Sequence, residues 1–311
     1  METTETWPKP LLQANGPMRR DKLDGAAEGM GKWGEETRAL AAEGWIPPDM
    51  MTGLTLFLLS NQPRDPQIKQ VIPGGGGGVA GGVWVRERFT IHRPLRREEI
   101  FNVTGDSIGR HVHKGRRYGT TRSVTMNSQG QRAASNLTTG LLAYKVEKGL
   151  VDRLEGCNPD EIEPFGPDWD LAENNPHRQT LRSLKQGDTF GGHEVVVGIS
   201  LMQARDTDKP DNPIHSDPEL AKKAGLAKPI AGGSHVLSFP LENIMQAVGR
   251  YALLHGAAFD VRWRAPVYAD VAIRPHVMVA AVSPDRVRFS MEAMLDTGVS
   301  AMVGEVTVPL V

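Results

Sequence analysis

The most informative stretch of this chain runs from Asp211 to His235 and reads DNPIHSDPELAKKAGLAKPIAGGSH. Asn212-Pro213 is a turn signal, and a side chain held just after such a turn can be aimed at a cleft. His215 stands there, and an unperturbed pKa of roughly 6.5 suits histidine to proton transfer near neutral pH. A neighbouring carboxylate or amide can fix the tautomer of the ring. The candidates for that partner are Asp208, Asp211 and Asn212.

The end of the same stretch predicts the start of a helix. Two glycines, Gly232 and Gly233, precede apolar residues that recur at helical spacing, so we expect a helix from about Gly233 to Val248. The first N–H groups of a helix have no partner within it, and the helix dipole favours negative charge there. A thioester carbonyl that becomes an enolate would be stabilised at such a position.

These residues resemble the signature of MaoC-like (R)-specific enoyl-CoA hydratases. The usual pattern of that family is Gly-Asp-x-Asn-Pro-x-His-x-Asp, followed by Ala-Gly-Phe-x-x-Pro-Ile-x-His-Gly. The close match spans about 25 residues, and the order of strands and helices extends it loosely over residues 185–311. The matching positions are Asn212, Pro213, His215 and Asp217 in the first part and Ala224, Gly225, Pro229, Ile230 and Gly233 in the second.

The resemblance implies an α+β fold of the double hot-dog type, in which two curved antiparallel sheets each wrap a central helix. We expect an irregular leader over residues 1–30 and a degenerate N-terminal hot-dog domain over residues 31–150, which lacks the motif. A proline-rich linker over residues 151–185 would then lead to the C-terminal MaoC-like domain, residues 186–311, which carries the catalytic motif.

Sequence patterns outside the motif agree with two similar units. A short helix over 35–43, an apolar helix after Asp49 and strands over 83–91, 118–126 and 133–146 are expected in the first half. The second half repeats this order, with a strand over 193–199, a polar loop, the helix 233–248 and strands near 259–263, 271–282, 286–295 and 302–308. FTIHRPL, from Phe89, also resembles VRWRAPV, from Val261.

The activity that the family implies is reversible hydration of a 2-enoyl-CoA to a 3-hydroxyacyl-CoA, which would make this chain a hydro-lyase. His215 would be the acid/base, Asp211 or else Asp208 its carboxylate partner, Asn212 an orienting residue and Gly233 the oxyanion donor. Substrate-binding positions would be Gly232, Ile230 and Ser234. Arg262 and Arg264 could meet the phosphates of CoA, although a charged outer strand face explains them equally well.

Two positions depart from the family pattern. The aspartate of the pattern falls on Pro210, and the histidine before the final glycine is replaced by Gly232. Since His215 and Asn212 are present, one interpretation is a shifted loop that still delivers a carboxylate. The other interpretation is loss of hydratase activity.

Two further functions stay open. A hot-dog thioesterase would need a carboxylate on the central helix, where Glu242 is the only acidic candidate. A non-catalytic acyl-CoA-binding subunit would need a partner to complete its site. Free thiol release, or activity that does not depend on His215, would separate these possibilities from a hydratase.

Composition excludes several other classes. The 311 residues carry a formal net charge of -1, which gives no general attraction to nucleic acid or an anionic membrane. Residues 74–78 are glycines that read as a flexible connection, and residues 111–117 as a solvated loop, not a metal site. A single cysteine and no visible signal sequence favour the cytoplasm. We expect no metal, no cofactor beyond the CoA of the substrate, and a homodimer or higher homo-oligomer.

Overall fold

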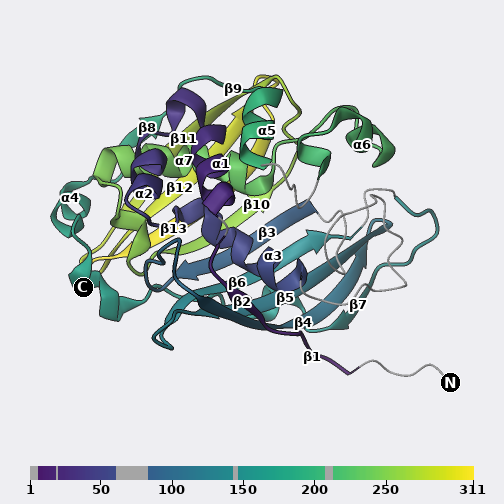
Figure 1. The fold of residues 1–311 in the computed structure, drawn as a ribbon, viewed down its shortest axis with the longest axis horizontal. Coiled ribbons are helices and arrows are strands. Elements are labelled where there is room, and N and C mark those ends of the chain that lie inside the picture. Colours follow the sequence, from purple (N-terminus) through teal and green to yellow (C-terminus); the bar gives the residue numbers. More distant parts are fainter. Residues whose placement is uncertain (1–5, 19, 61–82, 143–145, 207–212) are drawn as a thin grey trace.

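The chain forms a large antiparallel sheet with helices laid across it (Figure 1). The structure, a computed structural model, describes residues 6–18, 20–60, 83–142, 146–206 and 213–311. Within these ranges the strands follow the order β1-β4-β5-β6-β3-β10-β13-β12-β11-β8, while β2 and β7 also pair with β4, and β9 with β11. The N-terminal half supplies β1 Lys9–Pro10, β2 Ala14–Gly16, β3 Val83–Ile91, β4 Phe101–His113, β5 Arg116–Met126, β6 Arg132–Leu141 and β7 Arg153–Gly156. The C-terminal half supplies β8 Thr189–Gly191, β9 Val195–Val197, β10 Ala258–Trp263, β11 Val271–Val282, β12 Arg286–Leu295 and β13 Ser300–Pro309.

Each half of the sheet carries its own central helix. α3 packs on β4, β5 and β6, and α7 packs on β11 and β12, with α1, α2 and α5 further from the sheet (Figure 1). The α-helices are α1 Arg20–Gly29, α2 Glu35–Ala42, α3 Gly53–Ser60, α4 Arg178–Ser183, α5 Ile199–Asp206, α6 Pro218–Lys223 and α7 Gly233–Val248. Short 3-10 turns are η1 Gly31–Trp33, η2 Pro48–Thr52, η3 Pro159–Glu161, η4 Trp169–Asn174, η5 Pro213–His215 and η6 Ala252–Leu254. The expected α+β architecture is therefore confirmed.

The two halves place equivalent segments in equivalent contacts. The N–H of Ile46, before the N-terminal central helix, donates to the carbonyl of Leu95 at 2.9 Å, and the N–H of Ala231, before α7, donates to that of Val267 at 2.8 Å. The neighbouring residues form isolated bridges, Trp45 with Arg96 and Ile230 with Tyr268. The stretches FTIHRPL, from Phe89, and VRWRAPV, from Val261, therefore occupy equivalent positions in the two halves.

The seam between the halves is the antiparallel pair β3 and β10. Phe89 lies opposite Phe259, and their rings stack with centroids 4.2 Å apart. Both side chains are buried on the face of the sheet that carries the central helices. The seam therefore joins the two half-sheets into one surface with a shared apolar interior.

Alternate residues of β3 hold the linker on the opposite face of the sheet. The side chain of Arg88 donates to the carbonyl of Ile162 at 2.8 Å, and Thr90 Oγ1 donates to that of Phe165 at 2.9 Å. Beyond the end of the strand, His92 Nδ1 lies 3.3 Å from Asp168 Oδ2. Side chains of a strand alternate between the two faces of the sheet. Residues 158–168 therefore cover the outer face of β3, and the helices cover its inner face.

The structure corrects several sequence expectations. The irregular leader expected over residues 1–30 contains regular elements, since residues 9–10, 14–16 and 20–29 form β1, β2 and α1. Residues 111–117 are the β4–β5 hairpin rather than a loop, and α5 replaces the beginning of the expected polar loop after residue 199. The glycines at 74–78 lie outside the described residues. The domain boundaries at residues 150 and 185 remain a prediction.

Two negative findings apply to the described ranges alone. None of their helices combines the length and apolar character needed to cross a bilayer. Within the same ranges, no group of three or more His, Cys, Asp or Glu side chains is arranged to hold a metal ion.

A polar network fills the interior of the N-terminal half. Glu87 on β3 is 0% exposed and accepts hydrogen bonds from Asn136 at 2.8 Å and Thr138 at 3.3 Å. Thr138 in turn donates to Thr55 of α3, which contacts Ser123. Burial disfavours the charged carboxylate and raises the pKa of Glu87 to about 8. The side chain is therefore mostly protonated at neutral pH.

We predict that this carboxyl makes the protein less stable as pH rises. In the folded protein Glu87 keeps its proton up to about pH 8, whereas an unfolded glutamate loses it near pH 4.5. The stability that Glu87 contributes is thus fully present below pH 4.5 and is lost between there and pH 8, with a slope of up to about 1.4 kcal/mol per pH unit. Urea unfolding of wild type and Glu87→Gln at pH 5.5 and 8 tests this. The variant should show the smaller loss, and an equal loss in both proteins refutes the assignment.

Candidate active site

The start of α7 offers backbone N–H groups with no side-chain cap. Gly232 is the N-cap, with φ -60° and ψ 149°, and no side chain caps the helix there. The preceding strand-like residues are fixed, because Ala231 bonds to Val267 and Ile230 bridges to Tyr268. Helix geometry leaves the N–H groups of Gly233 and Ser234 without an acceptor inside the helix. This end of α7 can therefore receive a developing negative charge.

Trp263 on β10 sets the position of Gly233. The indole Nε1 donates to the carbonyl of Gly233 at 3.0 Å. A Cβ atom on Gly233 would lie only 2.9 Å from Cε2 of the same ring, too close for any other residue without a shift. Trp84 of β3 lies beside this indole, with ring centroids 6.1 Å apart. The helix start thus rests on an aromatic surface that requires a glycine.

His215 lies against the same helix start. Its Nδ1 is 2.7 Å from the carbonyl oxygen of Ile230. A carbonyl oxygen only accepts, so Nδ1 carries the proton, and in a neutral ring Nε2 holds the lone pair. A methyl group on Gly232 would lie 3.9 Å from Nε2 and 4.0 Å from the adjacent ring carbons. The structure therefore brings the basic nitrogen of His215 and the start of α7 together, as the motif spacing predicts.

Local packing holds His215 in this place. The Asp217 carboxylate accepts from the N–H groups of Glu219 at 2.8 Å and Leu220 at 3.0 Å, so it caps α6. Behind it a small apolar cluster buries Ile214, Ala224 and Ile230. The N–H of Ile230 also donates to the carbonyl of Ile214 at 3.3 Å. The segment after the proline turn is consequently docked directly on the strand that leads into α7.

The predicted carboxylate partners are not placed. Asp208, Asp211 and Asn212 belong to residues 207–212, which lie outside the described residues. A hydrogen bond joins the residues on either side of this segment: the side chain of Gln203, in α5, donates to the carbonyl of Ser216 at 3.1 Å. On the same helix, Arg205 forms an ion pair with Asp49, whose side chain is 1% exposed. The identity of the carboxylate beside His215 therefore remains a prediction.

His235 is a structural residue in the first turns of α7. Its Nε2 donates to the carbonyl of Gly29 at 2.8 Å, and its ring stacks on Phe239. Burial lowers the pKa of His235 to about 3, and nearby Arg205 adds to the effect. The neutral ring connects α1 to α7.

Of the predicted substrate-binding residues, Ser234 lies at the start of α7, whereas Arg262 and Arg264 lie on or just after β10. Arg262 pairs with Arg86 across β10 and β3, on the face of the sheet opposite to Trp263. Arg262 and Arg264 are both exposed. Ser234 is half-buried in the first turn of α7, next to Gly233. A role of the two arginines in binding CoA stays a prediction, and the structure does not bring Arg262 to His215.

Glu242, the carboxylate that a thioesterase would use, already has partners. It is 2% exposed and accepts from the N–H of Glu36 at 2.6 Å, the N–H of Thr37 at 3.0 Å and the hydroxyl of Thr37 at 2.7 Å. These groups form the first turn of α2, so Glu242 caps that helix from α7. Burial raises the pKa of Glu242. The carboxyl is structural and gives no support to a thioesterase.

Comparison with known proteins identifies the segment that carries these contacts. Residues 209–297 match the family model described as "MaoC like domain". The C-terminal half contains a MaoC-like domain. No curated protein matches this chain in sequence.

Solved structures resemble the chain over nearly its whole length. A MaoC-like dehydratase is 17% identical with a TM-score of 0.67, and 96% of each chain is covered. The full-length peroxisomal multifunctional enzyme type 2 from Drosophila melanogaster is 15% identical with a TM-score of 0.63, over 96% of this chain and 48% of that one. A Mycobacterium tuberculosis protein described as a double hotdog is 10% identical with a TM-score of 0.57, over 95% and 93% of the two chains. The fold of this chain is accordingly the double hot-dog.

Sequence reasoning missed two residues that shape the MaoC-like domain. Trp263 was noticed only as part of a strand, although its indole fixes the start of α7. Arg205 was assigned to a polar loop, although it anchors α5 on Asp49, 156 residues away. The sequence does show a tryptophan at the end of a predicted strand and an arginine after an apolar run. Neither signal tells which distant residue the side chain contacts.

We predict that Gly233→Ala disrupts the MaoC-like domain. The new Cβ would overlap the Trp263 ring, so the helix start must shift, with a loss of about 1–3 kcal/mol in the free energy of unfolding. Gly53→Ala is the matched control, since Gly53 begins α3 with φ -67° and has nothing within 4 Å of its Cβ position. That control should be neutral or slightly stabilising. Chemical denaturation measures both, and equal stability of the two variants contradicts the role given to Trp263.

Proposed function

We propose that this chain is a hydro-lyase that interconverts a 2-enoyl-CoA and a 3-hydroxyacyl-CoA thioester. The MaoC-like domain supports a hydratase or dehydratase at the level of the family. The observation that carries the proposal for this chain is the hydrogen bond that holds the His215 ring on Ile230, two residues before Gly232, the N-cap of α7. A base and an oxyanion donor at one helix start can act on one small conjugated thioester.

In the proposed reaction the Gly233 N–H donates a hydrogen bond to the thioester oxygen. His215, with its carboxylate partner, takes a proton from water, and hydroxide adds to C3 of the enoyl group. Electrons move from the double bond to the thioester oxygen, which becomes an enolate. The His and carboxylate pair then returns one proton to C2, so the net change is the addition of one water molecule. Dehydration follows the same path in reverse.

Each chain residue has a distinct part in this proposal. The bond from Nδ1 of His215 to the Ile230 carbonyl directs the lone pair of Nε2 outward from that carbonyl. Asp211, or else Asp208, would stabilise the charged ring, and Asn212 would orient the water or the ring. Gly232 and Ser234 flank the oxyanion donor and would contact the acyl group. The proposal includes no cofactor besides the CoA of the substrate, and it takes the protein to be a homodimer or higher homo-oligomer in the cytoplasm.

The non-catalytic alternative keeps one specific feature in its favour, because Pro210 occupies the usual aspartate position of the motif. Such a subunit would bind acyl-CoA but leave it unchanged. Incubation of the purified protein with crotonyl-CoA and longer enoyl-CoAs distinguishes the two. Loss of the absorbance of the conjugated thioester indicates hydration, whereas binding without any absorbance change indicates the alternative.

We predict that His215→Gln lowers kcat for hydration by about 100- to 10,000-fold, because the variant cannot accept the proton from water. The rate is followed by the absorbance of the conjugated thioester. His113→Gln is the matched control, since His113 is exposed at the β4–β5 hairpin and should leave the rate within twofold. Equal rates for wild type and His215→Gln exclude the imidazole as the catalytic base.

The carboxylate partner can be assigned by the same assay. Asp211→Asn and Asp208→Asn are compared, and we expect the larger loss, of at least about 100-fold, from Asp211→Asn. The opposite ranking assigns the partner to Asp208. Full activity of both single variants and of the double variant contradicts a mechanism that needs either carboxylate.

A further inference from the structure

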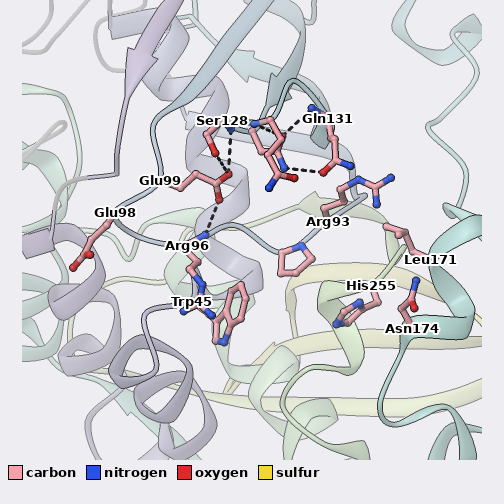
Figure 2. A pocket seen from close by; sticks show the side chains of 13 residues that line it. Trp45, Arg93, Arg96, Glu98, Glu99, Ser128, Gln131, Leu171, Asn174 and His255 are labelled. Atoms are coloured by element: carbon pink, nitrogen blue, oxygen red, sulfur yellow. Dashed lines mark hydrogen bonds between the residues drawn. The ribbon is translucent and has the colours of Figure 1, made fainter.

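A second candidate binding site lies in the N-terminal half, away from His215. It is a pocket of about 660 Å³ formed where the segment after β3, the β5–β6 hairpin and the linker meet. Figure 2 shows Trp45 and Arg96 on one side, Leu171 and Asn174 on the other, and Ser128 and Gln131 of the hairpin above them. Apolar surface from Trp45, Pro94 and Leu171 is thus combined with polar groups.

Among the residues that line this pocket, Arg93 carries a buried side-chain donor without a hydrogen-bond partner. In the described part of the chain its guanidinium makes no hydrogen bond or ion pair, and its Nε is fully buried. Figure 2 shows the guanidinium between Gln131 of the hairpin and Leu171 of the linker. A buried donor without an acceptor is unfavourable by roughly 1–3 kcal/mol, and more when the group is charged. The Arg93 side chain as a whole is half-buried and lines the pocket, so an anionic ligand there can supply an acceptor to its guanidinium.

The acidic side chains of the pocket do not fill this need. The Glu99 carboxylate accepts from the N–H and hydroxyl of Ser128, at 3.1 Å and 2.8 Å, and from the N–H of Arg96 at 3.3 Å. Glu98 lies 3.6 Å from Arg97 and points away from Arg93 in Figure 2. Arg96 is stacked on the Trp45 ring at 3.9 Å. Arg93 consequently faces the open space with its charge uncompensated at close range.

Comparison with the C-terminal half separates this pocket from catalysis. Trp45 and Arg96 are equivalent to Ile230 and Tyr268, so Pro47 and Pro48 stand where the other half has Gly232 and Gly233. A proline has no N–H and cannot act as an oxyanion donor. A ligand here would meet no oxyanion donor like that of the candidate active site.

We propose that this pocket is a non-catalytic binding site for a small organic anion, whose carboxylate or phosphate is held by Arg93. A planar guanidinium binds both groups through paired N–H donors. The apolar part of the ligand would lie on Trp45, Pro94 and Leu171. The proposal does not depend on the hydro-lyase activity, since it concerns binding alone.

Isothermal titration calorimetry at low ionic strength tests this site with inorganic phosphate, acetate and hexanoate as probes. We expect wild type to bind at least one of the three, and Arg93→Met to bind it at least about tenfold more weakly, as loss of a charge-assisted hydrogen bond implies. Preference for phosphate or for the carboxylates identifies the anion. Stronger binding of hexanoate than of acetate supports a contact between the apolar part of the ligand and Trp45, Pro94 and Leu171.

Arg116→Met is the matched control. It removes the same charge from an exposed position at the far end of β5, about 30 Å along the strand from the pocket, and should bind like wild type. If Arg93→Met does not fold, Arg93→Lys keeps the charge but loses the paired donors, and should still bind more weakly. Absence of binding of all three probes to wild type, or equal binding by wild type and the Arg93 variant, overturns the proposal.

Discussion

The antiparallel pairing of β3 with β10 is the constraint on which the rest of the structure depends. It sets Phe89 against Phe259 and makes one continuous sheet from two half-sheets. With that register fixed, strand alternation decides which side chains face the central helices and which face the linker. Trp263 then meets the start of α7 on one face, while Arg86 and Arg88 hold residues 158–168 on the other.

The same framework supports a different interior in each half. Strand pairing places Glu87 and Thr138 in the N-terminal half where the C-terminal half has Phe259 and Val306. The helix entry differs as well, with two prolines in one half and two glycines in the other. A backbone donor at a helix start needs both an N–H and room for a ligand, and only the glycine version has both. The two halves can therefore share a fold while one carries the candidate catalytic groups.

The sequence predicted the C-terminal half best. α7 was predicted at Gly233–Val248 and β11 at Val271–Val282. In both segments apolar residues recur regularly over a long stretch, so the type of element is clear from the sequence. β4 was missed, since Gly105, Gly109 and several polar residues interrupt its alternation. α1 was missed because its glycines and charged residues resemble a loop, and its stability comes from packing on α5.

The candidate site was predictable only in part. The spacing of the motif was sufficient to predict that His215 lies at the start of α7. Between the two, the chain forms only a short helix capped by Asp217, and His215 then bonds to the carbonyl of Ile230. Contacts between distant segments were not predictable: the support of Gly233 by Trp263 and the anchoring of Arg205 on Asp49 arise only when the strands and helices are assembled. The choice between Asp211 and Asp208 remains a prediction because both residues lie outside the part of the chain that the structure describes.

A crystal structure of the His215→Gln variant with bound crotonyl-CoA tests the central claim most directly. The account predicts the thioester oxygen within about 3.2 Å of the Gly233 nitrogen, and the C3 atom facing the side chain of residue 215 with room for one water between them. A thioester whose oxygen points away from the start of α7, or whose C3 atom lies on the opposite side of the helix from residue 215, contradicts it.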